Sequence, residues 1–370
     1  MDDSARAYRT ADFDYPLPSE LIAQTPSPRR GDSRLLVVRR KDAKTQRGSA
    51  AERRKDAKPQ SESEFQDQRF GDLIDLIPPG DLLVLNTTRV LPARLVGRRA
   101  SGAPAEVLLI HPAGDGTWVA MGKPGSALRI GRQIDLGQGI SLETLELLEE
   151  GYRRVRVLGA TAEEAMERVG RVPLPPYIER EPTAEDAVRY QTVFAERPGS
   201  VAAPTAGLHL TEAMLEALGR RGVGIARLTL EVGPGTFKPV DEEDPARHSM
   251  HPEPFEISLE AAGLVADARR RGAGVWAVGT TVVRALESAA REDGTISPGR
   301  AETRLMIRPG YRFRIVDRLI TNFHLPRSTL LMLVAGFAGF DLVMAAYRHA
   351  VRERYRFYSY GDAMLLERER

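Results

Sequence analysis

The chain has no cysteine, and this absence removes several kinds of chemistry at once. Among its 370 residues there is no thiol to form a disulfide, to act as a nucleophile, or to hold a cysteine-ligated zinc or iron–sulfur site. A chain without disulfides is compatible with a reducing compartment, and we expect a cytoplasmic location.

The chain also lacks a large excess of charge of one sign and a long apolar run. The formal net charge is only +2, so any binding to nucleic acid must use a local basic patch. The longest apolar run, residues 330–340, is broken by Gly336 and Gly339 and is too short to cross a bilayer. The first residues, Met-Asp-Asp-Ser-Ala-Arg, contain no apolar core of a signal peptide. We therefore expect no membrane partner.

The sequence pattern predicts an α/β protein with a discontinuous large domain. Residues 94–170 form a run of short strands punctuated by glycine, typical of a small all-β barrel or sandwich. After residue 200 strands alternate with helices, as in α/β folds. We therefore predict a large α/β domain from residues 1–93 and 171–370, with a small β-barrel domain, 94–170, inserted in it.

Local signals predict individual elements. Thr161, Thr211 and Ser258 precede apolar periodic stretches and should cap helices, while Gly170, Gly222 and Gly272 should end them. Buried strands are expected at 34–38, 82–85, 225–232, 275–278, 305–307 and 315–321.

Residues 39–69 form a polar interval with an internal repeat, Arg-Arg-Lys-Asp-Ala-Lys at 39–44 and again at 53–58. Because it holds scarcely an apolar residue, it is predicted to be a disordered loop. Ten basic and six acidic residues give it a local charge of +4. It is interpreted as a solvated insertion, with an electrostatic hook for RNA as the alternative.

Small residues dominate the stretch Tyr190–His209, whose Val-Ala-Ala-Pro-Thr-Ala-Gly-Leu-His end suits the wall of a pocket. Four polar or glycine-bearing turns follow predicted strands, at 204–209, 231–236, 279–281 and 321–327, where α/β folds place ligands. Gly279-Thr280-Thr281 opens a helix and could bind an anion with Arg284, or could be a plain helix cap. His209 and His324 could form a general acid/base pair, or could be buried structural histidines.

Several familiar motifs are incomplete. The Glu231–Thr236 segment lacks the full Gly-x-Gly-x-x-Gly spacing, which argues against a Rossmann methyltransferase. Three residues of types that often bind metal ions stand close together, namely His248, His251 and Glu253. A loop with a proline does not fix the arrangement of such side chains around an ion, so we expect no metal.

Longer strings resemble one family, the S-adenosylmethionine:tRNA ribosyltransferase-isomerases of queuosine biosynthesis. They lie in family order from residue 13 to the C-terminus. The strings include Phe-Asp-Tyr-Pro-Leu-Pro at 13–18, Asp-Leu-Leu-Val-Leu-Asn-Thr-Thr-Arg-Val-Leu-Pro-Ala-Arg at 81–94, Val-Ala-Ala-Pro-Thr-Ala-Gly-Leu-His at 201–209, Val-Gly-Thr-Thr-Val-Val-Arg at 278–284, Thr-Asn-Phe-His-Leu-Pro-Arg at 321–327 and Tyr-Arg-Phe-Tyr-Ser-Tyr-Gly-Asp-Ala-Met at 355–364.

The resemblance implies a fold and a reaction. The fold is an α/β barrel-like large domain with an inserted small β-barrel. The ribosyl moiety of S-adenosylmethionine moves to the aminomethyl group of a 7-deazaguanine at the tRNA wobble position and is isomerised. Epoxyqueuosine-tRNA forms, and adenine and methionine leave. The partners are this tRNA and S-adenosylmethionine, which is consumed, so no cofactor is implied. We expect a monomer.

Site residues follow from setting that reaction against the matching motifs. His209 and His324 are predicted general acid/base residues. The predicted substrate-binding residues are Thr205, Gly207, Gly233, Gly235, Thr280, Thr281, Arg284 and Asn322. Arg89, Arg94 and Arg327 are predicted to contact tRNA phosphates. One residue departs from the family pattern, because Glu231 stands where the motif usually has histidine; we count it as a catalytic residue whose proton-donor role is in doubt. A non-catalytic RNA-binding protein on the same scaffold is the competing hypothesis.

Overall fold

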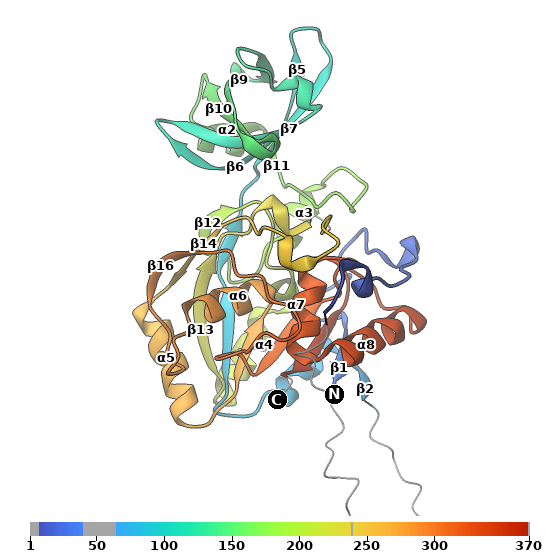
Figure 1. Ribbon diagram of the computed structural model, residues 1–370. Coiled ribbons are helices and arrows are strands. Elements are labelled where there is room, and N and C mark those ends of the chain that lie inside the picture. Colours follow the sequence, from blue (N-terminus) through green and yellow to red (C-terminus); the bar gives the residue numbers. More distant parts are fainter. Residues whose placement is uncertain (1–6, 40–63, 238–239, 369–370) are drawn as a thin grey trace, which may run out of the picture.

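The computed structural model describes residues 7–39, 64–237 and 240–368. Figure 1 shows a large body of sheet and helices with a smaller group of strands, β5 to β11, set apart at one end. The greater part of the predicted 39–69 loop lies outside the described residues. Its last five residues do not: Phe65–Arg69 form strand β2, paired antiparallel with β1, so the disorder prediction is wrong for them.

One nine-stranded mixed sheet runs through the body, in the order β16-β14-β13-β3-β15-β17-β18-β1-β2. Its strands are β1 (Arg34–Val38), β2 (Phe65–Arg69), β3 (Leu82–Asn86), β13 (Gly224–Leu230), β14 (Glu253–Ile257), β15 (Val275–Val278), β16 (Gly299–Thr303), β17 (Arg318–Asn322) and β18 (Ala363–Glu367). Strands β13, β3, β15 and β17 are parallel neighbours. Every residue of β3 and β15 is buried, as expected for strands covered on both faces.

The large sheet is open. Its edges are β16 and β2, and the two do not pair within the described part of the chain. This corrects the barrel-like expectation for the large domain while leaving it an α/β fold. The predicted strand at 305–307 is also absent; the chain instead forms β16 at 299–303.

Helices cover the two faces unequally. The first face packs against the longer helices, and its core includes Val84, Ala277 and Leu319. These helices are α5 (Leu259–Arg270), α6 (Thr280–Ala289), α7 (Thr329–Ala338) and α8 (Phe340–Arg352). The opposite face, with Leu83 and Trp276, is covered by α1 (Leu73–Leu76) and α4 (Glu212–Arg220). The predicted caps Thr211 and Ser258 each accept a hydrogen bond from the third helical residue.

The smaller sheet closes on itself, which confirms the small barrel. Its order β11-β5-β6-β7-β10-β9-β8 gains an extra β5–β8 pairing, and this joins six strands into a ring. The strands are β5 (Arg94–Arg99), β6 (Pro104–Gly114), β7 (Thr117–Lys123), β8 (Gln133–Gly137), β9 (Ile140–Leu147), β10 (Arg153–Leu158) and β11 (Gly170–Arg171). Helix α2 (Ala162–Val169) begins with the predicted Thr161–Glu164 capping box and packs on the barrel core.

Three short elements complete the body: α3 (Ala184–Arg189), and the parallel pair β4 (Thr88–Val90) and β12 (Arg197–Ser200). In the described part of the chain, no single helix is both long and apolar enough to cross a membrane. Only α7 and α8 taken together pass that test, and they are bent by 117°.

Candidate active site

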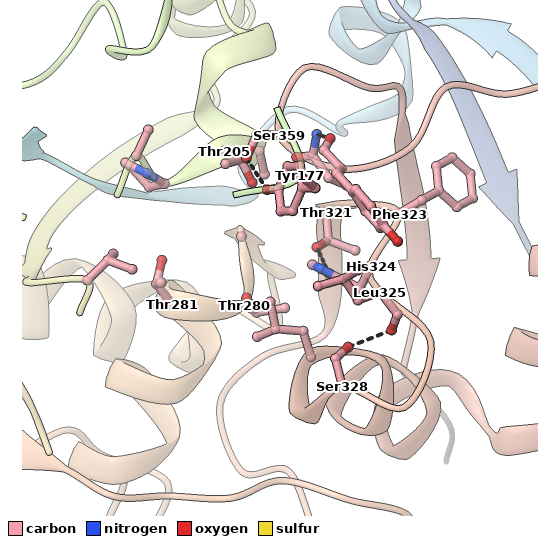
Figure 2. Close-up of a pocket in the computed structure, with 18 residues that line it drawn as sticks. Tyr177, Thr205, Thr280, Thr281, Thr321, Phe323, His324, Leu325, Ser328 and Ser359 are labelled. Atoms are coloured by element: carbon pink, nitrogen blue, oxygen red, sulfur yellow. Dashed lines mark hydrogen bonds between the residues drawn. The ribbon is translucent and has the colours of Figure 1, made fainter. Parts of the chain in front are cut away.

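A pocket opens where strands β15 and β17 end at the carboxyl edge of the large sheet (Figure 2), which is where open α/β sheets bind ligands. It encloses about 630 Å³ of empty space, a volume that includes its solvent-open mouth. The lining residues are Tyr177, Ala203, Pro204, Thr205, Ala206, Val232, Gly279, Thr280, Thr281, Thr321, Asn322, Phe323, His324, Leu325, Ser328, Leu330, Tyr358 and Ser359. None of them is acidic or a lysine or arginine.

The N-terminus of α6 forms one wall. Gly279, its N-cap, has φ 96° and ψ 154°, a conformation that glycine adopts and other residues avoid. No side chain caps the first turn, so the backbone N–H groups there are left for a ligand. Thr280 and Thr281 are buried on this wall, and Thr281 Oγ1 accepts a hydrogen bond from Asn86 Nδ2 at 3.4 Å. The helix dipole favours a carboxylate or phosphate at this position.

His324 faces the pocket from the opposite wall (Figure 2). Its Nε2 lies 2.7 Å from Thr321 Oγ1, and Nδ1 has no hydrogen-bond partner among the described residues. Tyr15 donates to its carbonyl oxygen at 2.5 Å and Tyr347 accepts from its N–H at 2.9 Å, which fix the backbone. Burial lowers the pKa of His324 to about 3, so the ring is neutral at physiological pH.

His209 lies behind the pocket wall and does not line it. Its Nδ1 is 2.7 Å from Ser33 Oγ, its Nε2 is 3.2 Å from Asn322 Nδ2, and its ring stacks on Phe70 with centroids 4.8 Å apart. Burial lowers its pKa to about 4, although the bond to Asn322 opposes this. The two histidines therefore share one region through Asn322, but only His324 contacts the pocket. A proton-transfer role for either stays a prediction.

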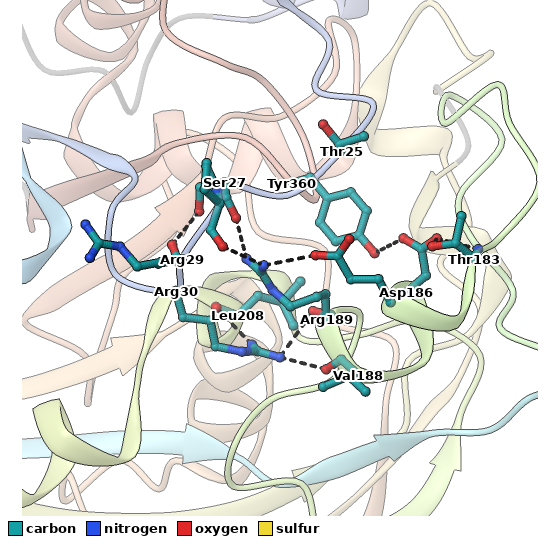
Figure 3. A network of polar contacts seen from close by, with 12 residues as sticks. Thr25, Ser27, Arg29, Arg30, Thr183, Asp186, Val188, Arg189, Leu208 and Tyr360 are labelled. Atoms are coloured by element: carbon teal, nitrogen blue, oxygen red, sulfur yellow. Dashed lines mark hydrogen bonds and ion pairs between the residues drawn. The ribbon is translucent and has the colours of Figure 1, made fainter.

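A polar network holds the segment before His209 in place (Figure 3). Arg30 donates to the carbonyls of Leu208, at 3.0 Å, and Gln191, at 2.5 Å. Nearby, Asp186 accepts from Arg180 and from Tyr360 Oη, at 2.7 Å. Burial alone would raise the pKa of Asp186, but these bonds hold it well below its usual range. The network ties the segment before His209 to residues of the C-terminal region.

Glu231 does not join the predicted constellation. Its side chain lines a separate hollow with Arg197, Glu256 and Arg300, while its neighbour Val232 lines the pocket. Successive residues of an extended segment point in opposite directions, which explains the separation. Burial raises the pKa of Glu231, with Arg300 and His111 opposing the shift.

Arg284 is not available to a substrate carboxylate in this structure. It is 4% exposed, forms an ion pair with Glu253, and donates through Nε to the carbonyl of Leu305 at 3.0 Å. It contacts β14 and the segment after β16, away from the pocket. Arg284 therefore has a structural contact and does not line the pocket, and its carboxylate-binding role stays a prediction.

The predicted close-approach glycines also lie outside the pocket lining. A Cβ on Gly207 would come within 2.8 Å of Phe194, and one on Gly235 within 2.6 Å of His251, so protein side chains explain both glycines. Around Gly233 a Cβ would meet nothing within 4 Å. Thr205, Thr280, Thr281 and Asn322 do line the pocket, and their substrate-binding role stays a prediction.

The three arginines that are predicted to contact tRNA differ in exposure and in the partners that their side chains already have. Arg94 is engaged by Glu106 at 2.8 Å and Glu181 at 3.1 Å, and these bonds raise its pKa despite partial burial. Arg89 is exposed and donates to the carbonyl of Ala195 at 3.1 Å. Arg327 is exposed and has no ion-pair partner among the described residues.

Some lining residues were given no role from the sequence. Tyr177 and Ser359 hydrogen-bond to each other at 2.6 Å, and Tyr358 and Ser328 complete the wall. Tyr358 and Ser359 lie in the string at 355–364 that carries the resemblance, so membership in that string was the available signal for these two. Of the possible metal ligands, His251 pairs with Glu150 at 3.4 Å and Glu253 with Arg284. In the described residues no group of three or more such side chains could hold a metal ion.

Comparisons with known proteins place the chain in a family. A family model described as queuosine biosynthesis protein matches residues 10–366. The chain is 50% identical to an S-adenosylmethionine:tRNA ribosyltransferase-isomerase of Anaeromyxobacter sp. strain Fw109-5 over 365 residues, 97% of this chain and 99% of that protein. The protein of the same name from Symbiobacterium thermophilum is 47% identical, with the same coverage of each chain.

A solved structure of a similar protein supports the same family assignment. The crystal structure of an S-adenosylmethionine tRNA ribosyltransferase from Thermotoga maritima is 36% identical, has a TM-score of 0.51, and covers 96% of this chain and 99% of its own. Since the sequence matches extend over almost the whole chain, the chain belongs to the queuosine biosynthesis protein family, that of the S-adenosylmethionine:tRNA ribosyltransferase-isomerases.

Proposed function

We propose that this chain transfers the ribosyl moiety of S-adenosylmethionine to the aminomethyl group of a 7-deazaguanine at the tRNA wobble position and isomerises it. The products are epoxyqueuosine-tRNA, adenine and methionine. S-adenosylmethionine is a consumed co-substrate, so the reaction uses no further cofactor. The chain acts as a monomer in the cytoplasm and has no membrane partner.

One observation carries the proposal. A single uncharged pocket at the carboxyl edge of the sheet combines the free N-terminus of α6, the amide of Asn322 and the ring of His324. The family motifs Val278–Arg284 and Thr321–Arg327 supply all three. S-adenosylmethionine carries a carboxylate for the helix N-terminus and a flat heterocycle for the apolar and aromatic walls.

We assign proton transfer to His324 before His209, because His324 lines the pocket. In the tautomer with hydrogen on Nε2, that nitrogen donates to Thr321 Oγ1 and Nδ1 keeps a lone pair toward the pocket. This lone pair takes the acidified proton from the sulfonium-bearing 5′-carbon. The protonated ring then returns a proton to the departing adenine. A low pKa keeps Nδ1 unprotonated before the reaction.

Thr280 and Thr281, with the backbone N–H groups of α6, bind the methionine carboxylate in this proposal, and Thr205 closes the same wall. Arg327 and Arg89 are the better candidates for tRNA phosphates because both are exposed. Arg94 is the weaker one because two carboxylates already engage it. Glu231 has no step assigned to it, since its side chain lines a different hollow.

A direct assay tests the proposal. The protein is incubated with S-adenosylmethionine and tRNA bearing 7-aminomethyl-7-deazaguanine, and adenine is measured by chromatography. We expect adenine and methionine in equal amounts, and none with the same tRNA carrying guanine at the wobble position. His324→Gln should lower turnover about 100-fold or more. Methylated RNA together with S-adenosylhomocysteine would instead establish a methyltransferase, and tRNA binding without turnover would establish the non-catalytic alternative.

A further inference from the structure

The side-chain amide of Asn322 has a defined orientation. Its nitrogen lies 3.0 Å from the carbonyl oxygen of Tyr358, and a carbonyl only accepts, so Nδ2 must face Tyr358. The second Nδ2 hydrogen is directed at His209 Nε2, 3.2 Å away. Both donors are thereby used. The carbonyl oxygen Oδ1 is buried and has no hydrogen-bond partner within the described part of the chain, although Asn322 lines the pocket.

His209 and Ser33 maintain this orientation. Because Asn322 donates to Nε2, His209 carries its hydrogen on Nδ1 and donates it to Ser33 Oγ, 2.7 Å away. Stacking on Phe70 keeps the ring in its plane. A reversed amide would lose the bond to Tyr358, since two acceptors would then face each other. The orientation of the amide, which leaves Oδ1 unpaired, is therefore fixed by groups that are buried themselves.

The pocket suits an uncharged N–H donor. An unpaired buried acceptor has lost its hydrogen bond to water, and a ligand N–H can replace that bond. No lining residue is acidic, so no carboxylate of the pocket would pair with an ammonium group that approached Oδ1 itself. Tyr177, Phe323 and Tyr358 supply aromatic surface for a flat ring.

We propose that Asn322 Oδ1 accepts a hydrogen bond from the 6-amino group of the adenine of S-adenosylmethionine, with His209 and Ser33 as positioning residues. This inference rests on the proposed function and names the group that selects the donor substrate. Adenine is favoured over the tRNA base because the same pocket contains the N-terminus of α6, and S-adenosylmethionine carries a carboxylate and an adenine on one molecule. A base with a 6-oxo group would place an acceptor oxygen against the acceptor Oδ1, and no hydrogen bond could form between them.

Binding of two ligands that differ at this position tests the proposal. Titration calorimetry compares S-adenosylhomocysteine with S-inosylhomocysteine. The full-length wild-type chain should bind the 6-amino compound about 10- to 100-fold more tightly. In Asn322→Ala the ratio of dissociation constants should fall to within about threefold of one. The matched control is Thr144→Val, a buried isosteric change in the small barrel whose hydroxyl has no partner in the described structure, and it should keep the wild-type ratio.

A second variant tests the same proposal in case Asn322→Ala does not fold. His209→Phe keeps a ring against Phe70 but removes the acceptor for Asn322, so discrimination between the two compounds should fall at least about threefold. Unchanged discrimination in folded variants would overturn the proposal. So would an Asn322→Ala effect confined to the KM for tRNA, because the amide would then read the tRNA base. If wild-type protein discriminates but never releases adenine, the proposed reaction fails while the recognition stands.

Discussion

Two buried histidines stand on either side of Asn322, and their environments make them neutral for the same reason. Each ring is nine-tenths buried, and neither has a carboxylate partner among the described residues. A neutral ring donates one hydrogen bond and accepts one, whereas an imidazolium donates two and accepts none. Protonation of either ring would therefore rearrange the site as well as charge it.

The first prediction concerns pH and stability. The folded-state pKa values, about 4 for His209 and about 3 for His324, lie below the ordinary 6.5. Between pH 6.5 and those values the unfolded chain binds more protons, so stability falls as the solution is acidified. We expect a loss on the order of 1–3 kcal/mol per histidine by pH 4, measured by urea unfolding from pH 7 to pH 4.

The double variant His209→Asn, His324→Gln provides the control. It should unfold more easily at pH 7 but show a flatter dependence on pH in that window. An equal slope in both proteins would mean that the acid sensitivity comes from other groups.

At the scale of residues, the sequence predicted positions better than directions. Thr280, Asn322 and His324 were expected at strand ends and line the pocket. The side-chain direction of Glu231 and the Arg284–Glu253 pair were not predictable, because one depends on strand register and the other on a partner 31 residues away. His209 was predicted as catalytic from its motif, but its place behind Asn322 depends on Ser33, far away in sequence.

Helix α6 depends on an N-cap that only glycine occupies easily. Gly279→Ala should lower the free energy of unfolding by about 1–3 kcal/mol, because its positive φ is strained for alanine. Gly263→Ala, inside α5 with no atom near the added Cβ, should raise stability by about 0.5–1 kcal/mol. Chemical denaturation of both variants measures the contrast. If Gly279→Ala did not lower the free energy of unfolding while Gly263→Ala raised it, backbone conformation would not be the controlling factor at Gly279.

The same helix is joined to β14 by the buried Arg284–Glu253 pair. Arg284→Met leaves the carboxylate without this partner and should lower stability by about 3–5 kcal/mol. Adding Glu253→Leu should recover part of that loss, as unfolding of the double variant would show. If Arg284→Met instead raised the KM for S-adenosylmethionine with stability unchanged, a direct substrate contact would be indicated.

Elements with local signals were predictable, and elements that need distant partners were less so. The caps Thr161, Thr211 and Ser258 act within one turn and stand where the sequence put them. Strand β2, with its polar sequence FQDQR, gave no periodic apolar signal and exists because β1 pairs with it. The openness of the large sheet also could not be read from the sequence, since closure is decided by pairing between edge strands.

For the whole molecule, the polar insertion offers a test of how tRNA is held. Deleting residues 41–62 keeps β1 and β2 and removes most of the repeat. We expect the dissociation constant for tRNA and its dependence on salt to stay nearly unchanged, as filter binding at several salt concentrations would measure. A large loss of affinity with a shallower salt dependence would support the electrostatic hook.

The strand order has a consequence for synthesis on the ribosome. Strand β18, residues 363–367, lies between β17 and β1, and among the described strands β1 pairs only with β18 and β2. After β2 is made, nearly 300 further residues must be translated, on the order of tens of seconds, before the β1–β2 pair can join the sheet. The small barrel, encoded between residues 94 and 171, needs no such wait. During that interval the apolar residues of β1 lack their final neighbours, so this part of the sheet is the last to be protected from contact with other chains.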